Sequence, residues 1–535
     1  MKDQLDREKY PRMPWHDVHC ALWGPPCRDV ARHFVQRWNY AKRSKAPNEQ
    51  AIPLLLPQHH MVIPHYLTGQ EATEARIEAE HALQRQVSEK EQLVSARSSY
   101  EDIPLLLPKE EEKDPEIREN TLNFKNSGRL KDQVSSIGNM NHTTDQEWWE
   151  VEQRELGEMD FNLIGEAGPR SRCKCQVIRS VGQWSAGTSQ LEERSIHTAY
   201  CSLIEKAEFF VYIENQFFIS GLDSDDIIHN RVLQALYMRI MRAHEDRRCF
   251  RVIVVMPLLP GFQGGVDDSG AASVRAIMHW QYRTICRGKQ SLLQRLLDRL
   301  GPDLENYISF YGLRNHGKLY ENGPLSTSQI YVHSKIMIVD DRTVLIGSAN
   351  INDRSLLGSR DSELGVVIED TDYIQSTMNG NIWNAGRFAH SLRMSLWAEH
   401  LGIRQAEIDL VKDPVSNATY RGVWMSRAES NTKLYGSVFG SIPSDSIHSR
   451  VALRLAVAQQ KEKVGHTTID LGIAPKDPDQ GVVLNEGEGL SMSQESCIDA
   501  ICGHLVFFPL EFMADEDLRP VFKESEYYAS AQIFH

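Results

Sequence analysis

The 535-residue sequence lacks the apolar segments of a secreted or membrane-spanning protein. Its first ten residues, MKDQLDREKY, contain no apolar run, which argues against a signal peptide. The most apolar stretches, Phe209–Ile219 and Val252–Phe262, are too short to cross a bilayer. A net charge of −14 provides no overall basic surface for a phosphate backbone. We therefore expect a cytoplasmic protein that meets membranes only peripherally and has no nucleic acid partner.

Cysteine is also sparse, with nine residues spread along the chain. Only Cys173 and Cys175 lie close together, and no second pair completes a zinc-binding spacing. His16, His19 and Cys20 are neighbours, but no further ligands near them complete a metal site. We expect reduced thiols, a structural role for these three residues, and no metal.

The composition divides the chain into four segments. Residues 1–45 combine a strand near Trp15, a Gly-Pro-Pro turn and an amphipathic helix. Residues 46–170 are polar and contain the sequence IPLLLP twice, which predicts an exposed or disordered insertion. The repeat is interpreted as proline-bounded loop contacts, with a docking element as the alternative. Residues 171–410 are expected to form the main folded domain, and residues 411–535 to pack on it.

Between residues 171 and 410, predicted strands alternate with predicted helices. The run Arg251–Met256, rich in Val and Ile, is typical of a strand buried on both faces. Helices are expected at about 192–207, 226–244, 271–300 and 384–402, and strands near 177 and at 209–213, 251–256, 308–311, 329–339, 343–347 and 363–368. This alternation predicts an α/β fold, with a mixed sheet flanked by helices.

The stretch 331–350, YVHSKIMIVDDRTVLIGSAN, has the residue types that phosphodiester chemistry requires. On a continuous strand, His333 and Lys335 would project from the same face, and Asp340 would follow at a turn. An imidazole can attack phosphorus or protonate a leaving oxygen. A lysine and neutral donors, such as Ser348 and Asn350, can hold the phosphoryl oxygens.

These motifs resemble those of a known family. HSKIMIVD followed by GSANINDRS is similar to the second histidine-lysine-aspartate (HKD) motif of the phospholipase D superfamily. VYIENQFFIS, VMPLLPGF and INDRSLLGSRDSE resemble the eukaryotic branch that hydrolyses phosphatidylcholine. The segment PWHDVHCALWGPPCRDVARHFVQRWN and the long insertion look most like the plant zeta type, which carries PX and PH membrane modules.

The resemblance implies a phospholipase D (HKD) fold and a role for each matching residue. His333, Lys335 and Asp340 match the HKD triad, and Glu363 matches the acid that orients the active histidine. The implied phosphate-binding residues are Ser348, Asn350, Asn215 and Gln216. The implied reaction releases choline and phosphatidate from phosphatidylcholine through a phosphohistidine, can transfer phosphatidate to alcohols, and uses no metal or other cofactor.

A cluster of arginines over a helix end and the next strand has two interpretations. It comprises Arg239, Arg242, Arg247, Arg248 and Arg251. Such a run can be an ordinary solvated face, or it can contact phosphoinositides, because cationic side chains near an anionic membrane each contribute roughly 1 kcal/mol. The resemblance favours phosphoinositide contact.

The sequence contains one HKD motif, whereas complete enzymes of this kind have two. His316 and Lys318 form the only other His-x-Lys pair, and no Asp follows at the required distance. The chain is therefore expected to correspond to the second catalytic half plus a remnant of the first, whether Met1 is a genuine start or not. The main hypothesis is a phospholipase D; the alternatives are a regulatory or membrane-binding fragment and a single-motif nuclease active as a dimer. Pairing with an HKD-bearing N-terminal half, or self-association, is expected.

Overall fold

The computed structural model describes Asp6, residues 12–55 and residues 172–519, apart from gaps at 23, 189–190, 263, 268–270, 465–471, 476–481 and 484–490. The described residues belong to one compact unit. Most of the proposed 46–170 insertion, including the second IPLLLP, lies outside them.

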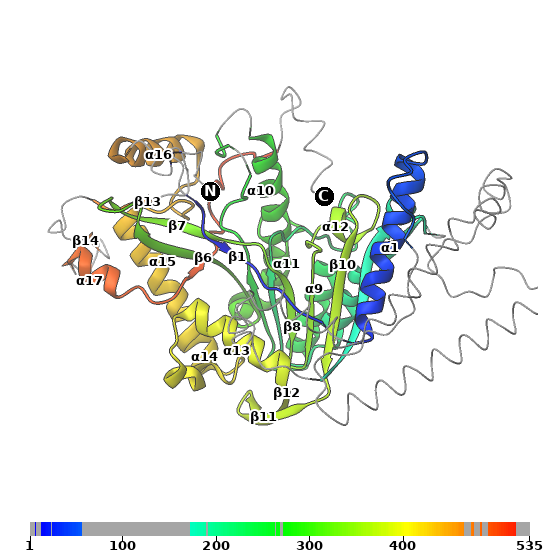
Figure 1. Ribbon diagram of the computed structural model, residues 1–535. Helices are drawn as coiled ribbons and strands as arrows, with labels where there is room; N and C mark the ends of the chain where they lie inside the picture. The colour runs from blue at the N-terminus through cyan, green and yellow to red at the C-terminus, as the bar shows by residue number, and fades with distance from the viewer. Residues whose placement is uncertain are drawn as a thin grey trace, which may run out of the picture. The chain divides into compact units, whose positions relative to one another are not determined.

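A 12-stranded mixed sheet organises this unit (Figure 1). Its main path runs β1-β7-β6-β5-β4-β8-β9-β10-β2-β3, with β13 beside β7 and β16 beside β6. β4, β5 and β6 are parallel, and β8, β9 and β10 form an antiparallel meander beside β4. The strands of the path are β1 (Trp15–His16), β2 (Cys173–Gly182), β3 (Glu192–Arg194), β4 (Phe210–Asn215), β5 (Arg251–Val255), β6 (Ile308–Lys318), β7 (Leu325–Val332), β8 (Lys335–Val339), β9 (Thr343–Gly347) and β10 (Glu363–Asp370).

The remaining elements are mainly helices around the sheet. They are α1 (Pro26–Lys45), α7 (Gln183–Ala186), α8 (Ser195–Lys206), α9 (Val232–Glu245), α10 (Ala272–Ile285), α11 (Leu292–Leu300), α12 (Asp353–Leu356), α13 (Arg387–Leu401), α14 (Asn417–Thr419), α15 (Ser426–Phe439), α16 (Arg450–Val464) and α17 (Gln494–Asp499). Short strands β11 (Tyr373–Met378) and β12 (Asn381–Gly386) form a separate hairpin, and β13 (Gly472–Ile473) and β16 (Leu505–Phe507) extend the main sheet. Among the described helices, none combines the length and apolarity needed to span a membrane.

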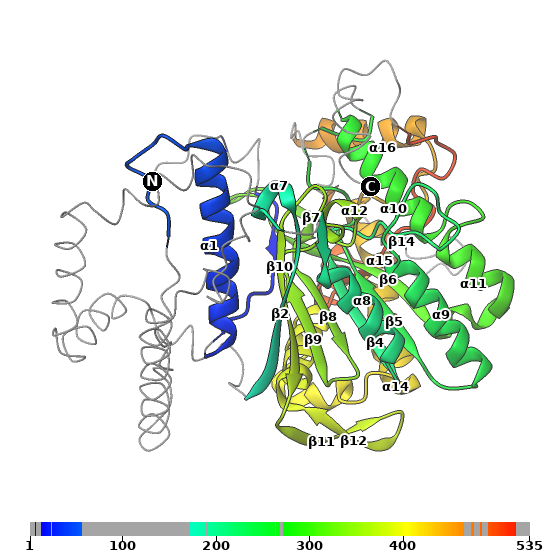
Figure 2. The same ribbon diagram turned by 90° about the vertical axis from the view of Figure 1, so that its right-hand side faces the viewer.

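The two faces of the central strands contribute to two separate hydrophobic cores. Val211 and Ile213 of β4 face a core that includes residues of α8, α9 and α10, whereas Phe210 and Tyr212 face a core with Trp397. Alternation along a strand sends successive side chains to opposite faces, so both faces must be covered. In Figure 2, α8 and α9 cover one face of the strands, and α1 stands beside β2. The predicted α/β fold with a mixed sheet flanked by helices is confirmed.

Several predicted boundaries are wrong. The strand expected at 329–339 is two strands, because His333 and Ser334 form a break between β7 and β8. The helix expected at 271–300 is divided into α10 and α11, with Gly288 at a positive φ of 84° in the connection. The helix expected at 384–402 begins at Arg387, after β12.

Candidate active site

His333 is held by the segment that contains β1. Its backbone N–H donates to the carbonyl oxygen of His16 at 2.7 Å, and its Nδ1 lies 2.8 Å from Oδ2 of Asp17. The ring of Trp15 lies 4.9 Å from its ring. The imidazole remains 35% exposed, so a reactant can reach it. The N-terminal segment therefore fixes the backbone and the ring of the candidate catalytic histidine while leaving the ring accessible.

Asp17 is a site residue that sequence reasoning missed. It lies within the PWHDVHC segment, but only the parallel pairing of β1 with β7 brings it to His333. Partial burial raises the pKa of the Asp17 carboxyl, but the hydrogen bond with His333 and the charge of Lys335 outweigh burial and lower it. Asp17 is consequently an ionised acceptor at neutral pH, and a proton on Nδ1 of His333 can satisfy it.

Lys335 begins β8 and reaches toward the same region. Its Nζ donates to Oε1 of Gln216 at 3.0 Å and to the carbonyl oxygen of His333. Gln216 also donates to the hydroxyl of Tyr331 at 3.0 Å, which fixes its amide. Burial lowers the pKa of Lys335 to about 8, although Asp17 and Glu363 act in the opposite direction. The structure thus brings together His333, Lys335 and Gln216.

Glu363 has different partners from those expected. Its carboxylate accepts from the hydroxyl of Ser348 at 2.5 Å and from that of Ser355 at 2.9 Å. Burial raises the pKa of Glu363, and these two hydrogen bonds oppose the rise. The expectation that Glu363 orients His333 is wrong in this structure, because Asp17 occupies Nδ1 of that ring. Glu363 instead holds the Ser348 hydroxyl, and its charge acts to raise the pKa of Lys335.

The two asparagines proposed as phosphate ligands differ in their surroundings. Asn215 is fully buried, and its Oδ1 accepts backbone N–H groups of Phe217 and Ile351 at 3.2 and 3.1 Å. It therefore joins the end of β4 to the segment after β9, and burial keeps its amide away from solvent. Asn350 is partly exposed, and its Oδ1 has no partner among the described residues. Its NH₂ group is the part that can donate to a phosphate oxygen, so Asn350 stays a candidate ligand.

Asp340 lies at the opposite end of β8 from Lys335. A strand rises about 3.3 Å per residue, so roughly 16 Å separates the two backbones. The Asp340 carboxylate accepts the backbone N–H groups of Glu208, Phe209 and Phe210 at 2.6 to 2.8 Å. Burial raises its pKa to about 6, against the effect of these three donors. The expectation of a catalytic role is at odds with this placement, since the carboxylate anchors the start of β4.

One group of potential metal ligands lies beneath the site. In the described part of the chain, His16, Glu214 and His400 alone bring three donor atoms within 4.8 Å of one another. Each imidazole Nε2 lies 2.9 Å from a different oxygen of Glu214, and Tyr212 and Ser334 donate to the same carboxylate at 2.6 Å. A metal ion would have to displace these bonds, so the donor set fits a hydrogen-bonded network better than a metal centre.

The predicted arginine cluster divides into buried and exposed members. Arg239 is 5% exposed, stacks on Phe250 and donates to the carbonyl oxygens of Ala207 and Glu208. Arg251 is also 5% exposed and donates to Asn306 and Asn417. The expectation that Arg239 contacts phosphoinositides is wrong, because its guanidinium group is buried and donates to internal carbonyl oxygens. Arg251 also makes internal bonds, but it lines the cavity that Arg247 and Arg248 border.

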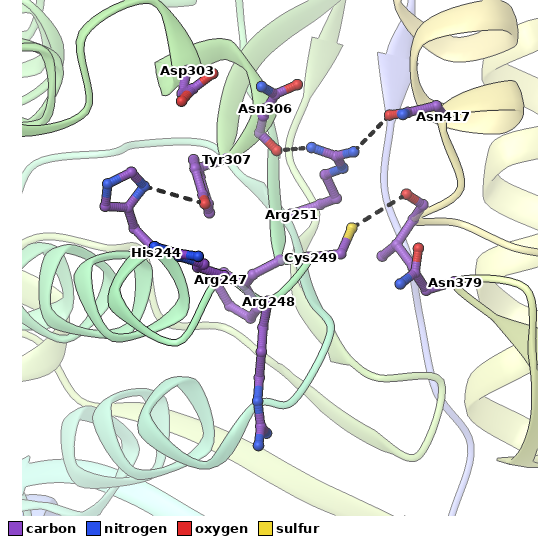
Figure 3. A pocket seen from close by; sticks show the side chains of 12 residues that line it. His244, Arg247, Arg248, Cys249, Arg251, Asp303, Asn306, Tyr307, Asn379 and Asn417 are labelled. Carbon is purple, nitrogen blue, oxygen red and sulfur yellow. Dashed lines mark hydrogen bonds between the residues drawn. The ribbon is translucent and has the colours of Figure 1, made fainter.

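The exposed members are Arg242, Arg247 and Arg248. The last two border a cavity of about 560 Å³ at the start of β5 (Figure 3). His244, Tyr307 and Asn379 also line it. Because β5 starts here and its parallel neighbour β4 ends beside Lys335, the cavity lies at the far end of these strands from His333. Its polar and cationic lining suits an anion with hydroxyl groups.

The comparisons with known proteins identify the family of the chain. The phospholipase D family model matches residues 3–90 and 169–448. Phospholipase D zeta 1 of Arabidopsis thaliana is 57% identical over 564 residues, covering 100% of this chain and 51% of that protein. Phospholipase D zeta 2 of the same plant is 55% identical, covering 100% and 49%. Human phospholipase D1 is 35% identical, covering 97% and 37%.

A histidine beside a sheet edge, a lysine on the next strand and an acid that holds the histidine are residue types that suit phosphodiester chemistry. The chain belongs to the phospholipase D family. Within it, the chain is similar to the plant zeta type, and this confirms the resemblance drawn from the motifs. The chain spans about half the length of the zeta relatives it matches.

Proposed function

We propose that this chain supplies one half of the active site of a phospholipase D that releases choline from phosphatidylcholine and leaves phosphatidate. The arrangement of His333 between Asp17 and Lys335 carries the proposal. Asp17 accepts a hydrogen bond from the protonated Nδ1 of His333, which leaves Nε2 with its lone pair for phosphorus. Lys335, when protonated, holds the phosphoryl oxygens as charge builds on them.

In the proposed reaction, a histidine nitrogen forms a bond to phosphorus while the bond to the choline oxygen breaks. The leaving alkoxide takes a proton from an acid of the other catalytic half. The group that gave up its proton then takes one from water as the water oxygen attacks phosphorus, and the phosphorus–nitrogen bond breaks to restore the imidazole. An alcohol that attacks in the same way gives a phosphatidyl alcohol. His333 serves either as the nucleophile or as the acid, because the other half supplies the complementary group.

The proposal makes the isolated chain a poor catalyst, because both histidines are needed. The test is choline release by the purified chain, with its oligomeric state checked by light scattering. Monomer alone is expected to release little choline, and co-expression with an HKD-bearing N-terminal half of a zeta-type enzyme should restore turnover. Robust turnover by a monomer would contradict the proposal. Nuclease activity confined to a dimer would favour the single-motif nuclease, and failure of complementation would favour a regulatory fragment.

We further propose that α1 contacts an anionic membrane surface. The helix carries six basic residues and one acidic residue, Asp29. Phe34 and Trp38 are 57% and 38% exposed, and their rings stack 6.0 Å apart. Exposed aromatic residues beside basic ones are typical of helices that lie in the membrane interface. The exposed aromatic face thus suits the acyl boundary, and the basic residues suit anionic head groups.

The cavity with Arg247 and Arg248 is proposed as a separate site for a phosphoinositide head group. Vesicle sedimentation separates the two contributions. Replacing Phe34 and Trp38 with Ala should weaken attachment to any anionic vesicle, whereas Arg247→Ala with Arg248→Ala should weaken only the additional attachment to phosphoinositide vesicles. Raised salt should reduce both. Equal binding to neutral and anionic vesicles would refute membrane contact through charge.

A further inference from the structure

Glu214 is a buried carboxylate with no part in the proposed chemistry. It is fully buried near the end of β4 and accepts hydrogen bonds from four different side chains. The donors are the hydroxyls of Tyr212 and Ser334 at 2.6 Å and the Nε2 atoms of His16 and His400 at 2.9 Å. These residues come from β4, the break between β7 and β8, β1 and α13. A single carboxylate therefore ties four segments of the chain together.

Two of these four segments determine where His333 lies. Ser334 is its immediate neighbour, and the bond to Glu214 fixes the direction of the chain at the break between β7 and β8. His16 accepts the backbone N–H of His333 at 2.7 Å through its carbonyl oxygen, and the next residue, Asp17, holds the ring. Both the backbone and the imidazole of His333 thus depend on segments that Glu214 anchors.

His16 and Glu214 carry opposite charges at neutral pH. Burial alone lowers the pKa of His16, but hydrogen bonds and charges from Glu214 and Glu399 outweigh it and raise the pKa to about 10. Burial raises the pKa of Glu214, and the two imidazoles outweigh this and hold it well below its usual value. A buried carboxylate beside an imidazolium satisfies both charges, whereas removing one partner leaves the other uncompensated. The position of β1 is therefore coupled to the charge on Glu214.

We propose that Glu214 is a positioning residue for the catalytic histidine, acting through Ser334 on one side and through His16 and Asp17 on the other. It does not touch the reacting atoms. This inference rests on the proposed function of His333, but its first test measures geometry and requires no turnover. Loss of the carboxylate leaves Lys335 and Gln216 in contact while it releases the Trp15–Asp17 segment from His333.

The test is amide hydrogen exchange of the full chain, compared between wild type and Glu214→Gln. Exchange at His333 and at the Trp15–Asp17 segment should rise at least tenfold in the variant, while β5 and β9 keep their protection. Glu399→Gln is the matched control, because Glu399 is 55% exposed and lies 3.5 Å from Nδ1 of His16. The control should change exchange at His333 less than threefold. Unchanged exchange at His333, or a uniform rise over the whole sheet, would overturn the positioning role.

A milder variant covers the case in which Glu214→Gln does not fold. Ser334→Ala removes one of the four donors and leaves the carboxylate paired with both histidines. Exchange at His333 should then rise about threefold, and no change would overturn the proposal. In the enzyme reassembled with an HKD-bearing half, either variant should lower kcat at least tenfold with less than a twofold change in KM. A change confined to KM would also overturn the proposal, because it would place the effect in substrate binding.

Discussion

Asp17 and His333 are 316 positions apart in the chain, yet the Asp17 carboxylate lies 2.8 Å from Nδ1 of the His333 imidazole. The contact places a residue of the N-terminal segment on the ring that the HKD motif provides. An acid on Nδ1 fixes the tautomer and the orientation of an imidazole and stabilises its protonated form. The segment 1–45, which was expected only as a remnant, therefore contributes to the candidate site.

Asp17→Asn should lower activity without loss of the fold. The amide can turn its NH₂ group toward Nδ1, which then accepts a hydrogen bond instead of donating one, so Nε2 carries the ring proton and cannot attack. We expect kcat of the reassembled enzyme to fall about 10² to 10⁴-fold, the range for a misoriented catalytic histidine. Asp29→Asn is the control, since that carboxylate is 56% exposed on α1. Equal activity of the two variants would argue against the contact.

His333→Asn should abolish phosphodiester cleavage. An asparagine can keep the backbone bond to His16, but it can neither attack phosphorus nor carry a proton to the leaving group. We expect a loss of at least about 10³-fold in kcat/KM, with the urea midpoint of unfolding unchanged. The measurement is choline release by the reassembled enzyme. A folded variant that keeps a tenth of the activity would show that the site lies elsewhere.

Asp340→Asn should lower the stability of the fold and leave the activity nearly unchanged, which is the reverse of the expectation for His333→Asn. The amide keeps Oδ1 for the backbone N–H groups of Phe209 and Phe210, but it points a donor at the N–H of Glu208. One buried hydrogen bond is lost and two donors face each other in its place, which lowers the unfolding free energy by about 2 kcal/mol. Asn tolerates the positive φ of 53° at this position. Urea unfolding should reveal the loss, while the activity of the folded fraction should change less than threefold. A 10³-fold loss of kcat would restore Asp340 to the catalytic set.

Local patterns were sufficient to predict the mixed sheet and the helices around it, but not every boundary. The Val and Ile runs of β4, β5 and β8 are apolar on both faces, and in the structure alternate residues supply the two cores. His333 and Lys335 come from one short stretch of sequence, so their proximity needed no knowledge of the topology. The same holds for Ser348, which follows the next strand of the meander.

Roles that depend on distant partners could not be predicted in this way. Asp17 reaches His333 only because β1 pairs with β7, and Glu363 is diverted to Ser348 and Ser355. The prediction that all five arginines contact phosphoinositides was too broad for a related reason. The sequence does not distinguish a buried arginine from an exposed one. In the structure, packing buries Arg239 against Phe250 and leaves Arg247 in solvent. Burial and pairing over long separations are properties of the fold, and spacing along the chain does not contain them.

Lys335 should make substrate binding sensitive to alkaline pH. Burial lowers its pKa to about 8, so the ammonium form predominates below pH 8 and the neutral amine above it. Only the ammonium form attracts the phosphodiester anion. We expect KM of the reassembled enzyme to rise about tenfold per pH unit above pH 8. Lys335→Arg keeps its charge, so its KM should stay level over this range while kcat falls at least about 10³-fold. A KM of the wild type that is constant from pH 7 to pH 10 would contradict the assignment.

The buried pair of His16 and Glu214 should give the folded chain a stability that declines in alkali. The pKa of His16 is about 10 in the folded chain against an ordinary 6.5, because Glu214 and Glu399 outweigh the effect of burial. A raised folded pKa contributes stability that is complete below pH 6.5 and is lost as the pH rises toward 10. The lowered pKa of Glu214 contributes stability that is lost only when the pH falls below about 4.5.

His16→Gln should therefore lower the unfolding free energy by about 3 kcal/mol at pH 6, as expected for a broken buried pair, and by progressively less toward pH 10. Urea unfolding at pH 6, 8 and 10 measures this difference, with the exposed His19→Gln as the matched control. A difference between wild type and His16→Gln that stays constant over this range would mean that the imidazole is neutral in the folded chain.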